Sequence, residues 1–129
     1  MTTPALDGIR VLDLASVGPG ARASRILADY GAEVLWIEPP GGDPYRTQLA
    51  IEYAVSLRNK SSVEIDLASG DGRAAVTALL PLVDGVVTSW RPGVAERLGV
   101  SPGDIAAIAP HVVTCSISGF GTDGPLRDV

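Results

Sequence analysis

The sequence has little of the chemistry that disulfides, metal clusters and nucleic-acid surfaces require. Its 129 residues include a single cysteine, Cys115, so neither an internal disulfide nor a cysteine-based metal cluster can form. One lysine and nine arginines stand against 15 acidic residues, which leaves a net charge of −5 and no basic stripe for a nucleic-acid backbone. The composition therefore predicts a protein of a reducing, cytoplasmic setting that binds no nucleic acid.

Long apolar runs are also missing. Nowhere do 18 apolar residues follow one another, and the first residues, MTTPALDGIR, do not have the pattern of a signal peptide, so neither export nor membrane insertion is indicated. The chain is nevertheless 46% hydrophobic and only 19% charged, which is a composition that folds. Its length suits one core, and we expect a single domain over residues 1–129.

Short apolar runs alternate with helical patterns along the chain. Strands are predicted at residues 9–15, 33–38, 63–67, 84–90 and 111–118, with helices from Pro19 and from residues 69, 94 and 101. Prolines and glycines predict a long loop at residues 39–46. This order predicts an α/β, Rossmann-like, doubly wound, mainly parallel sheet with helices on both faces and a ligand at the carboxyl ends of the strands. The glycine-rich ending suggests a domain incomplete at its C-terminus.

A dinucleotide site is the first chemical hypothesis. Gly18, Gly20 and Ala23 form G-x-G-x-x-A between a strand and a helix, and Glu38 ends the next strand. In such a fingerprint the glycines admit a pyrophosphate and the acid binds a ribose hydroxyl. Pro19, however, removes one backbone N–H donor, and a tight strand-to-helix turn in any doubly wound fold would give the same pattern.

A second hypothesis rests on several strings in a fixed order: LDGIRVLDLA, ILADYGAEVLWIEPPGGDPYR, NKSSVEIDL, DGVVTSWRPGVAERLGV and SISGFGTDGP. Together they resemble the N-terminal region of the class III CoA-transferase family (CaiB/BaiF type), which includes formyl-CoA transferases and α-methylacyl-CoA racemases. The resemblance implies a Rossmann-like domain that binds coenzyme A or an acyl-CoA as substrate, in a homodimer of chains about three times longer. A free-standing CoA-binding module is a further alternative.

The resemblance also implies where coenzyme A is bound. An acidic chain that binds phosphates must gather arginine locally, and an exposed indole can stack on adenine or line the pantetheine channel. Lys60, the only lysine, suits a structural salt bridge as well as a phosphate contact. Two positions depart from the family pattern, because Pro39 and Ser61 stand where arginines are usual. The implied CoA-binding residues are Val17, Gly18, Ile65, Ser89, Trp90, Arg91, Arg97 and Leu98.

No catalytic or metal-binding residue is predicted within the chain. Family transferases use an aspartate that attacks the thioester, and the racemases use a histidine and an acid; the resemblance places both beyond the loop at Gly119. We therefore expect the isolated chain to be inactive. Asp128 does not match that aspartate, His111 is predicted at the surface or a strand edge, and Cys115 is predicted to be a small buried hydrophobe.

Overall fold

A parallel sheet forms the centre of the computed structural model, which describes residues 2–16, 18–48 and 50–129. Its strands are β1 (Arg10–Asp13), β2 (Glu33–Glu38), β3 (Ser61–Glu64), β4 (Gly85–Thr88) and β5 (Val113–Ser116). They lie in the order β3-β2-β1-β4-β5, and every pairing is parallel. This is the order of a Rossmann-like sheet, so the predicted fold class is confirmed.

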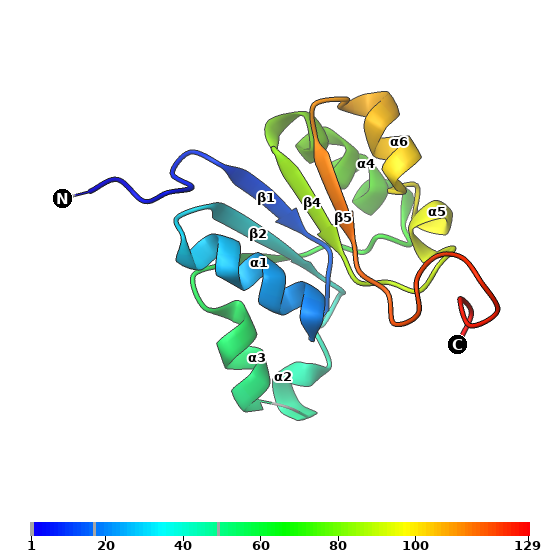
Figure 1. Ribbon diagram of the computed structural model, residues 1–129, viewed down its shortest axis with the longest axis horizontal. Coiled ribbons are helices and arrows are strands. Elements are labelled where there is room, and N and C mark those ends of the chain that lie inside the picture. Colours follow the sequence, from blue (N-terminus) through cyan, green and yellow to red (C-terminus); the bar gives the residue numbers. More distant parts are fainter. Residues whose placement is uncertain (1, 17, 49) are drawn as a thin grey trace.

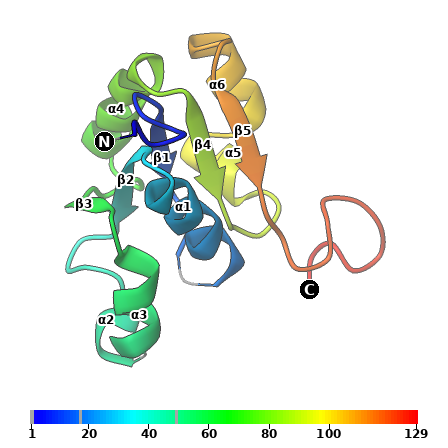
Figure 2. The ribbon, with the colours of Figure 1, turned by 60° about the vertical axis from the view of Figure 1, so that its left-hand side comes forward.

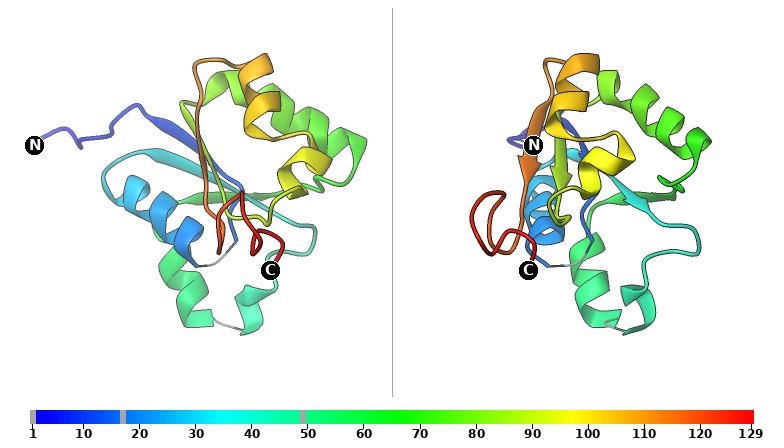
Figure 3. Two further views of the ribbon diagram at one scale, coloured as in Figure 1. Left: turned by 45° about the vertical axis from the view of Figure 1, so that its right-hand side comes forward. Right: turned by 90° about the vertical axis from the view of Figure 1, so that its right-hand side faces the viewer.

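Helices cover both faces of the sheet (Figures 1 and 3). One face carries α1 (Pro19–Asp29), with α2 (Tyr45–Gln48) and α3 (Ala50–Leu57) beside it. The other carries α4 (Gly70–Leu79), the 3-10 turn η1 (Leu80–Leu82), α5 (Val94–Leu98) and α6 (Pro102–Ile108). The connections after the strands gather at one edge of the sheet, which is where a doubly wound fold places its ligand.

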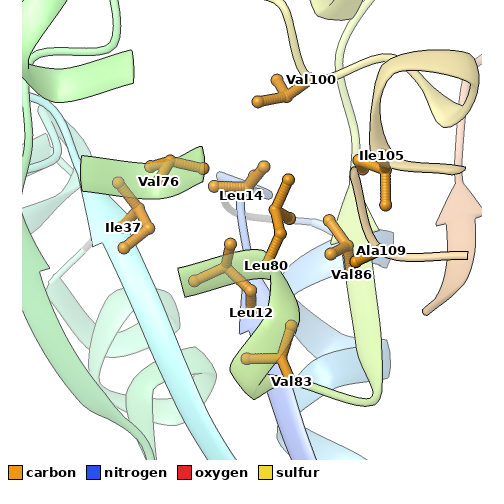
Figure 4. Close-up of a cluster of buried hydrophobic side chains, with 10 residues drawn as sticks. All are labelled: Leu12, Leu14, Ile37, Val76, Leu80, Val83, Val86, Val100, Ile105 and Ala109. Carbon is orange, nitrogen blue, oxygen red and sulfur yellow. The ribbon is translucent and has the colours of Figure 1, made fainter. Parts of the chain in front are cut away.

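The α4–α6 face is packed with aliphatic side chains. Leu12 and Val86 of the sheet meet Val76 of α4, Leu80 of η1 and Ile105 of α6, and each of these side chains is buried (Figure 4). Burial of a side chain of this size is worth about 1.5–3 kcal/mol. This apolar cluster, whose ten buried members are labelled in Figure 4, is the main hydrophobic core.

The α1 face is closer packed and has smaller side chains. Ala28 of α1 lies against a second group of strand residues that includes Val11, Val34 and Val87. Small side chains let the helix approach the sheet closely. Two polar groups of β1 and α1, Asp13 and Ser24, are also buried on this side.

Two helices begin with a side-chain cap. Ser69 Oγ accepts a hydrogen bond from the backbone N–H of Gly72 at the start of α4. At α6, Ser101 and Asp104 form a full capping box, in which each side chain accepts from the other's backbone N–H. Such pairs satisfy helix N–H groups that have no partner within the helix.

Two local predictions were wrong in the second quarter of the chain. The third strand lies at Ser61–Glu64 and not at 63–67, because the backbone turns at Asp66: its carbonyl accepts from Ser69 N–H and its carboxylate from Ala68 N–H. The predicted loop at 39–46 ends early, since Tyr45 already begins α2.

The prediction that Cys115 is buried was wrong, as its place on the edge strand β5 shows. Cys115 is exposed and not buried, because its side of this edge strand is open to solvent, as the 71% exposure of Val113 also shows. His111 is exposed as predicted, with Nε2 3.1 Å from the carbonyl oxygen of Val83. Within the described ranges, no helix is long and apolar enough to cross a membrane.

Candidate functional site

The carboxyl ends of β1, β2 and β3 border a pocket of about 330 Å³, here called the proline-loop pocket. Its wall is mostly apolar and includes Trp90, which lies in the segment after β4. Figure 2 shows how these strand ends and the following loops meet at one edge of the sheet. The lining residues are Leu14, Ala15, Ser16, Trp36, Ile37, Glu38, Pro39, Pro40, Asp43, Pro44, Ile65, Asp66, Leu67, Ala68, Trp90 and Leu98.

The loop at residues 39–44 is tied to the sheet by acidic side chains. Glu38 Oε2 accepts hydrogen bonds from the backbone N–H of Asp43 at 3.0 Å and from Tyr53 Oη at 3.1 Å. Asp43 in turn accepts from Ser16 Oγ at 2.8 Å. The loop is therefore held over the pocket from both β1 and β2.

This bonding decides the role of Glu38. The side chain is only 1% exposed, and its carboxylate is engaged within the protein. In the dinucleotide hypothesis, this acid would have to face solvent and bind a ribose hydroxyl. Its burial does not support that hypothesis.

The pocket wall carries negative and no positive charge. Its ionisable residues are Glu38, Asp43 and Asp66, and no basic residue stands among the described residues that line it. A phosphate would be repelled here, whereas an uncharged aromatic ring would find apolar surface and hydrogen-bond acceptors. The pocket is chemically suited to the uncharged part of a ligand.

A second pocket of about 220 Å³, the Arg91 pocket, lies on the other side of Trp90. It is formed by the loop after β4 and the loop after β5, and it carries the arginines Arg91 and Arg127. Guanidinium groups bind phosphates through several donors at once. Trp90 is therefore shared by an acidic, apolar pocket and a basic one.

Comparison with known proteins decides between the two hypotheses. Residues 6–129 match the sequence model of the CoA-transferase family III. The chain belongs to this family. It is 41% identical over 131 aligned positions to succinyl-CoA–D-citramalate CoA-transferase of Chloroflexus aurantiacus, with 95% of this chain and 33% of the relative covered. Formyl-CoA:oxalate CoA-transferase of Rhodopseudomonas palustris is 37% identical, with 98% and 31% covered.

The solved structures agree with this family assignment. A crystal structure of a hypothetical protein from Mycobacterium tuberculosis superposes with a TM-score of 0.94 at 33% identity. The alignment covers 98% of this chain and 37% of that chain. The chain thus spans about a third of the length of the CoA-transferases it matches.

The structure brings most of the residues implied by the family resemblance to the two pockets. Ile65, Trp90 and Leu98 line the proline-loop pocket. Ser89 and Arg91 line the Arg91 pocket, together with Trp90. Four implied residues from three separate segments therefore line two pockets that share the fifth, Trp90.

Two further implied residues, Gly18 and Arg97, lie elsewhere. Gly18 lines a separate hollow of about 140 Å³ with Arg22 and Arg25, between α1 and α3. Arg97 is exposed on α5 and lines neither pocket beside Trp90. Val17 lies outside the described residues. Gly18 and Gly20 differ in the space around them. A Cβ on Gly20 would lie 2.7 Å from Ala15 Cβ and 2.8 Å from Ser89 Cβ, whereas a Cβ on Gly18 would have no atom within 4 Å.

Lys60 forms a structural ion pair, one of the two roles that the sequence left open. Its Nζ lies 2.8 Å from Asp13 Oδ2, and both side chains are 0% exposed. Ser24 Oγ also donates to Asp13, at 2.5 Å. Burial raises the pKa of Asp13 above its ordinary value of 3.8, although the Lys60 ammonium and the hydrogen bonds act in the opposite direction. Sequence reasoning missed Asp13, because a single acid in a strand carries no signal of a distant partner.

Metal chemistry receives no support from the side chains. No group of three or more histidine, cysteine, aspartate or glutamate residues that could hold a metal ion exists among the described residues. Cys115 and His111 lie outside both pockets. What the site offers is a shaped surface with separated charge, which can bind and orient a ligand.

Proposed function

We propose that this chain is the coenzyme-A-binding portion of a CoA-transferase. The observation that carries the proposal is the pair of pockets on either side of Trp90, one acidic and apolar, the other basic. Coenzyme A has the same division, with an uncharged adenine and a pantetheine chain on either side of phosphates. The named relatives act on CoA thioesters, which supports the same ligand here.

Each implied residue has a proposed part in that binding. The adenine ring is proposed to lie in the proline-loop pocket, against Trp90, Ile65 and Leu98. Arg91 is proposed to bind a phosphate from the second pocket, and Arg97 to add positive potential from α5. Gly18, and Val17 before it, stay proposed contacts of the first turn, and Ser89 stays a proposed contact in the Arg91 pocket.

The transfer of CoA between carboxylic acids is proposed for the longer protein. The resemblance places the reactive aspartate beyond the glycine-rich loop at 119–124, and α-proton exchange on an acyl-CoA, the racemase reaction, remains a second possibility for the same reason. Glu38 and Asp43 are not proposed as nucleophiles, because both carboxylates hold the loop over the pocket. We accordingly expect CoA binding but no turnover from these 129 residues alone.

A homodimer in the cytoplasm is proposed on the same grounds. Exposed apolar side chains at Val113 and Phe120 offer surface that a second chain or a further segment would bury. The free, exposed thiol of Cys115 suits a reducing compartment. Size-exclusion chromatography with light scattering tests the dimer in a full-length family protein that contains this chain, and a monomer at high concentration would contradict it.

The ligand is tested by thermal-shift titration of the purified chain with CoA, acetyl-CoA and NAD. A ligand that binds only the folded state raises the unfolding midpoint, and the rise grows with ligand concentration. At a ligand concentration of 100 times Kd, the free energy of unfolding increases by about 2.7 kcal/mol. We expect a rise with CoA and acetyl-CoA and none with NAD. A rise with NAD alone would overturn the proposal in favour of a dinucleotide site.

A further inference from the structure

A buried charged cluster lies beneath the candidate site without reaching either pocket. It consists of Asp13 at the end of β1, Ser24 of α1 and Lys60 at the start of β3. We propose that this ion-pair cluster positions the turn after β1 and the first turn of α1, and thereby sets the affinity of the coenzyme A site. The inference rests on the proposed function.

Lys60 connects three separate elements. Its ammonium donates to Asp13 Oδ2 at 2.8 Å, to Ser24 Oγ at 2.8 Å and to the carbonyl oxygen of Ala21 at 2.9 Å. Since β3 is separated from β1 by β2, the side chain crosses β2, and its Nζ lies 5.5 Å from the ring centroid of Trp36. The edge strand is thereby tied to the central strand and to α1 by all three donors of one ammonium.

The first connection to the site runs through Asp13 itself. Its Oδ1 accepts a hydrogen bond from the backbone N–H of Ala15 at 2.9 Å, in the turn that follows β1. Ala15 and Ser16 line the proline-loop pocket, and Ser16 Oγ holds Asp43 of the loop above it. The orientation of the Asp13 carboxylate therefore decides where this wall of the pocket stands.

The second connection runs through α1. The carbonyl oxygen of Ala21 that binds Lys60 belongs to the residue after Gly20. Gly20 packs so closely on Ala15 and Ser89 that a single added carbon would collide with both. Any displacement of α1 is thus transmitted to Ser89, which lines the Arg91 pocket, and to Trp90 beside it, which lines both pockets.

A gain in the free energy of unfolding does not by itself explain why such a charged cluster is buried. Charges removed from water lose solvation that their attraction only partly restores, and apolar replacements of similar volume are often as stable. What an apolar pair would lack is direction, because the carboxylate and the ammonium fix particular backbone groups, Ala15 N–H and the Ala21 carbonyl. Positioning is the effect that these hydrogen bonds can produce and that burial alone cannot.

The test compares CoA affinity with stability in the 129-residue chain. Lys60→Met should weaken CoA binding about tenfold by isothermal titration calorimetry. Asp13→Asn/Lys60→Met removes the unpaired carboxylate, so its unfolding midpoint should recover above that of Lys60→Met while its CoA affinity stays low. Ile105→Ala on α6, a buried residue that lines neither pocket, is the control that lowers the midpoint and leaves the affinity unchanged.

Hydrogen exchange gives a readout that needs no ligand. In Lys60→Met, protection of the amides at 14–16 and 89–91 should fall, while the amide of Ile105, bonded to the carbonyl of Ser101, keeps its protection. If Lys60→Met does not fold, Ser24→Ala removes one bridge and keeps both charges. If the wild-type chain binds no CoA, the proposed function fails, and the exchange data still decide whether the cluster holds the turn.

Two results would overturn the inference. One is an unchanged CoA affinity in every folded variant of the cluster, together with unchanged exchange at 14–16. The other is a loss of affinity in Ile105→Ala equal to that in Lys60→Met at the same midpoint, which would mean that affinity merely follows stability.

Discussion

The two faces of one sheet are stabilised in different ways. Towards α4 and α6 the strands present mainly aliphatic side chains, such as Leu12 and Val86, to an apolar cluster. Towards α1 the same strand that carries Leu12 carries Asp13, which is buried against Lys60. Adjacent residues of β1 thus enter opposite environments. Apolar packing dominates the first face. The second face combines apolar packing with a buried, direction-dependent ion pair, and the first turn of the candidate site is built against it.

Breaking the ion pair should have the largest effect. Lys60→Met leaves the Asp13 carboxylate buried without its counter-charge, so we expect a loss of about 3–5 kcal/mol in the free energy of unfolding, measured by urea denaturation at pH 7. The double variant Asp13→Asn/Lys60→Met should lose clearly less. Equal losses in the two would show that the unpaired charge is not what destabilises the single variant.

Opening a cavity on the apolar face should cost nearly as much, by a different mechanism. Leu80 is fully buried, and Leu80→Ala should lower the free energy of unfolding by about 2–5 kcal/mol in the same urea experiment. Leu82→Ala, two residues away and 60% exposed, is the matched control and should change stability by less than about 0.5 kcal/mol. A large loss at Leu82 would contradict the assigned boundary of the core.

The pH dependence should separate the two mechanisms. A carboxyl whose folded pKa lies above its unfolded value favours folding below the unfolded value, and this contribution is lost as pH rises through the folded pKa. Asp13 already has a raised pKa, and without Lys60 it should rise further. The deficit of Lys60→Met should therefore shrink as the pH falls from 7 to 4. The deficit of Leu80→Ala should not shrink, and urea titrations at several pH values check both.

The smallest effect concerns a helix cap on the apolar side. Asp104→Ala removes one half of the capping box of α6 and should cost about 1 kcal/mol at pH 7. Hydrogen bonds from Ser101 hold the pKa of Asp104 below its ordinary 3.8, so its contribution is present above that value and is lost as pH falls through the folded pKa. The variant and the wild type should therefore converge in acid.

This comparison explains which features the sequence could predict. The apolar face follows from patterns that recur along the chain: strands at 33–38 and 84–90, and helices with Ser69 and Ser101 at their starts. Strand β3 was placed two residues late, because alternation at Val63, Ile65 and Leu67 suggested a buried face, whereas the Asx-type turn at Asp66 ends the strand. Periodicity carries no information on where such a turn falls.

The site was predictable only in part, for a related reason. Trp90, Ser89 and Ile65 follow strand ends, which a parallel sheet brings to one edge, so their meeting could be expected. Glu38 also ends a strand, but its carboxylate accepts a hydrogen bond from Tyr53 Oη. Tyr53 belongs to α3, a helix that was not predicted from the sequence. Lys60 and Asp13 are 47 residues apart along the chain, and only the folded arrangement pairs them.

The central claim is that coenzyme A binds around Trp90, and calorimetric titration of CoA into wild type, Trp90→Ala and Tyr30→Ala tests it most directly. Tyr30 is an exposed aromatic residue that follows α1 and lines neither pocket beside Trp90, which makes it the matched control. Loss of a stacked aromatic typically costs about 1–3 kcal/mol. We predict saturable binding to the wild type, a Kd at least about fivefold weaker in Trp90→Ala, and an unchanged Kd in Tyr30→Ala. Equal affinity in all three proteins would contradict the account.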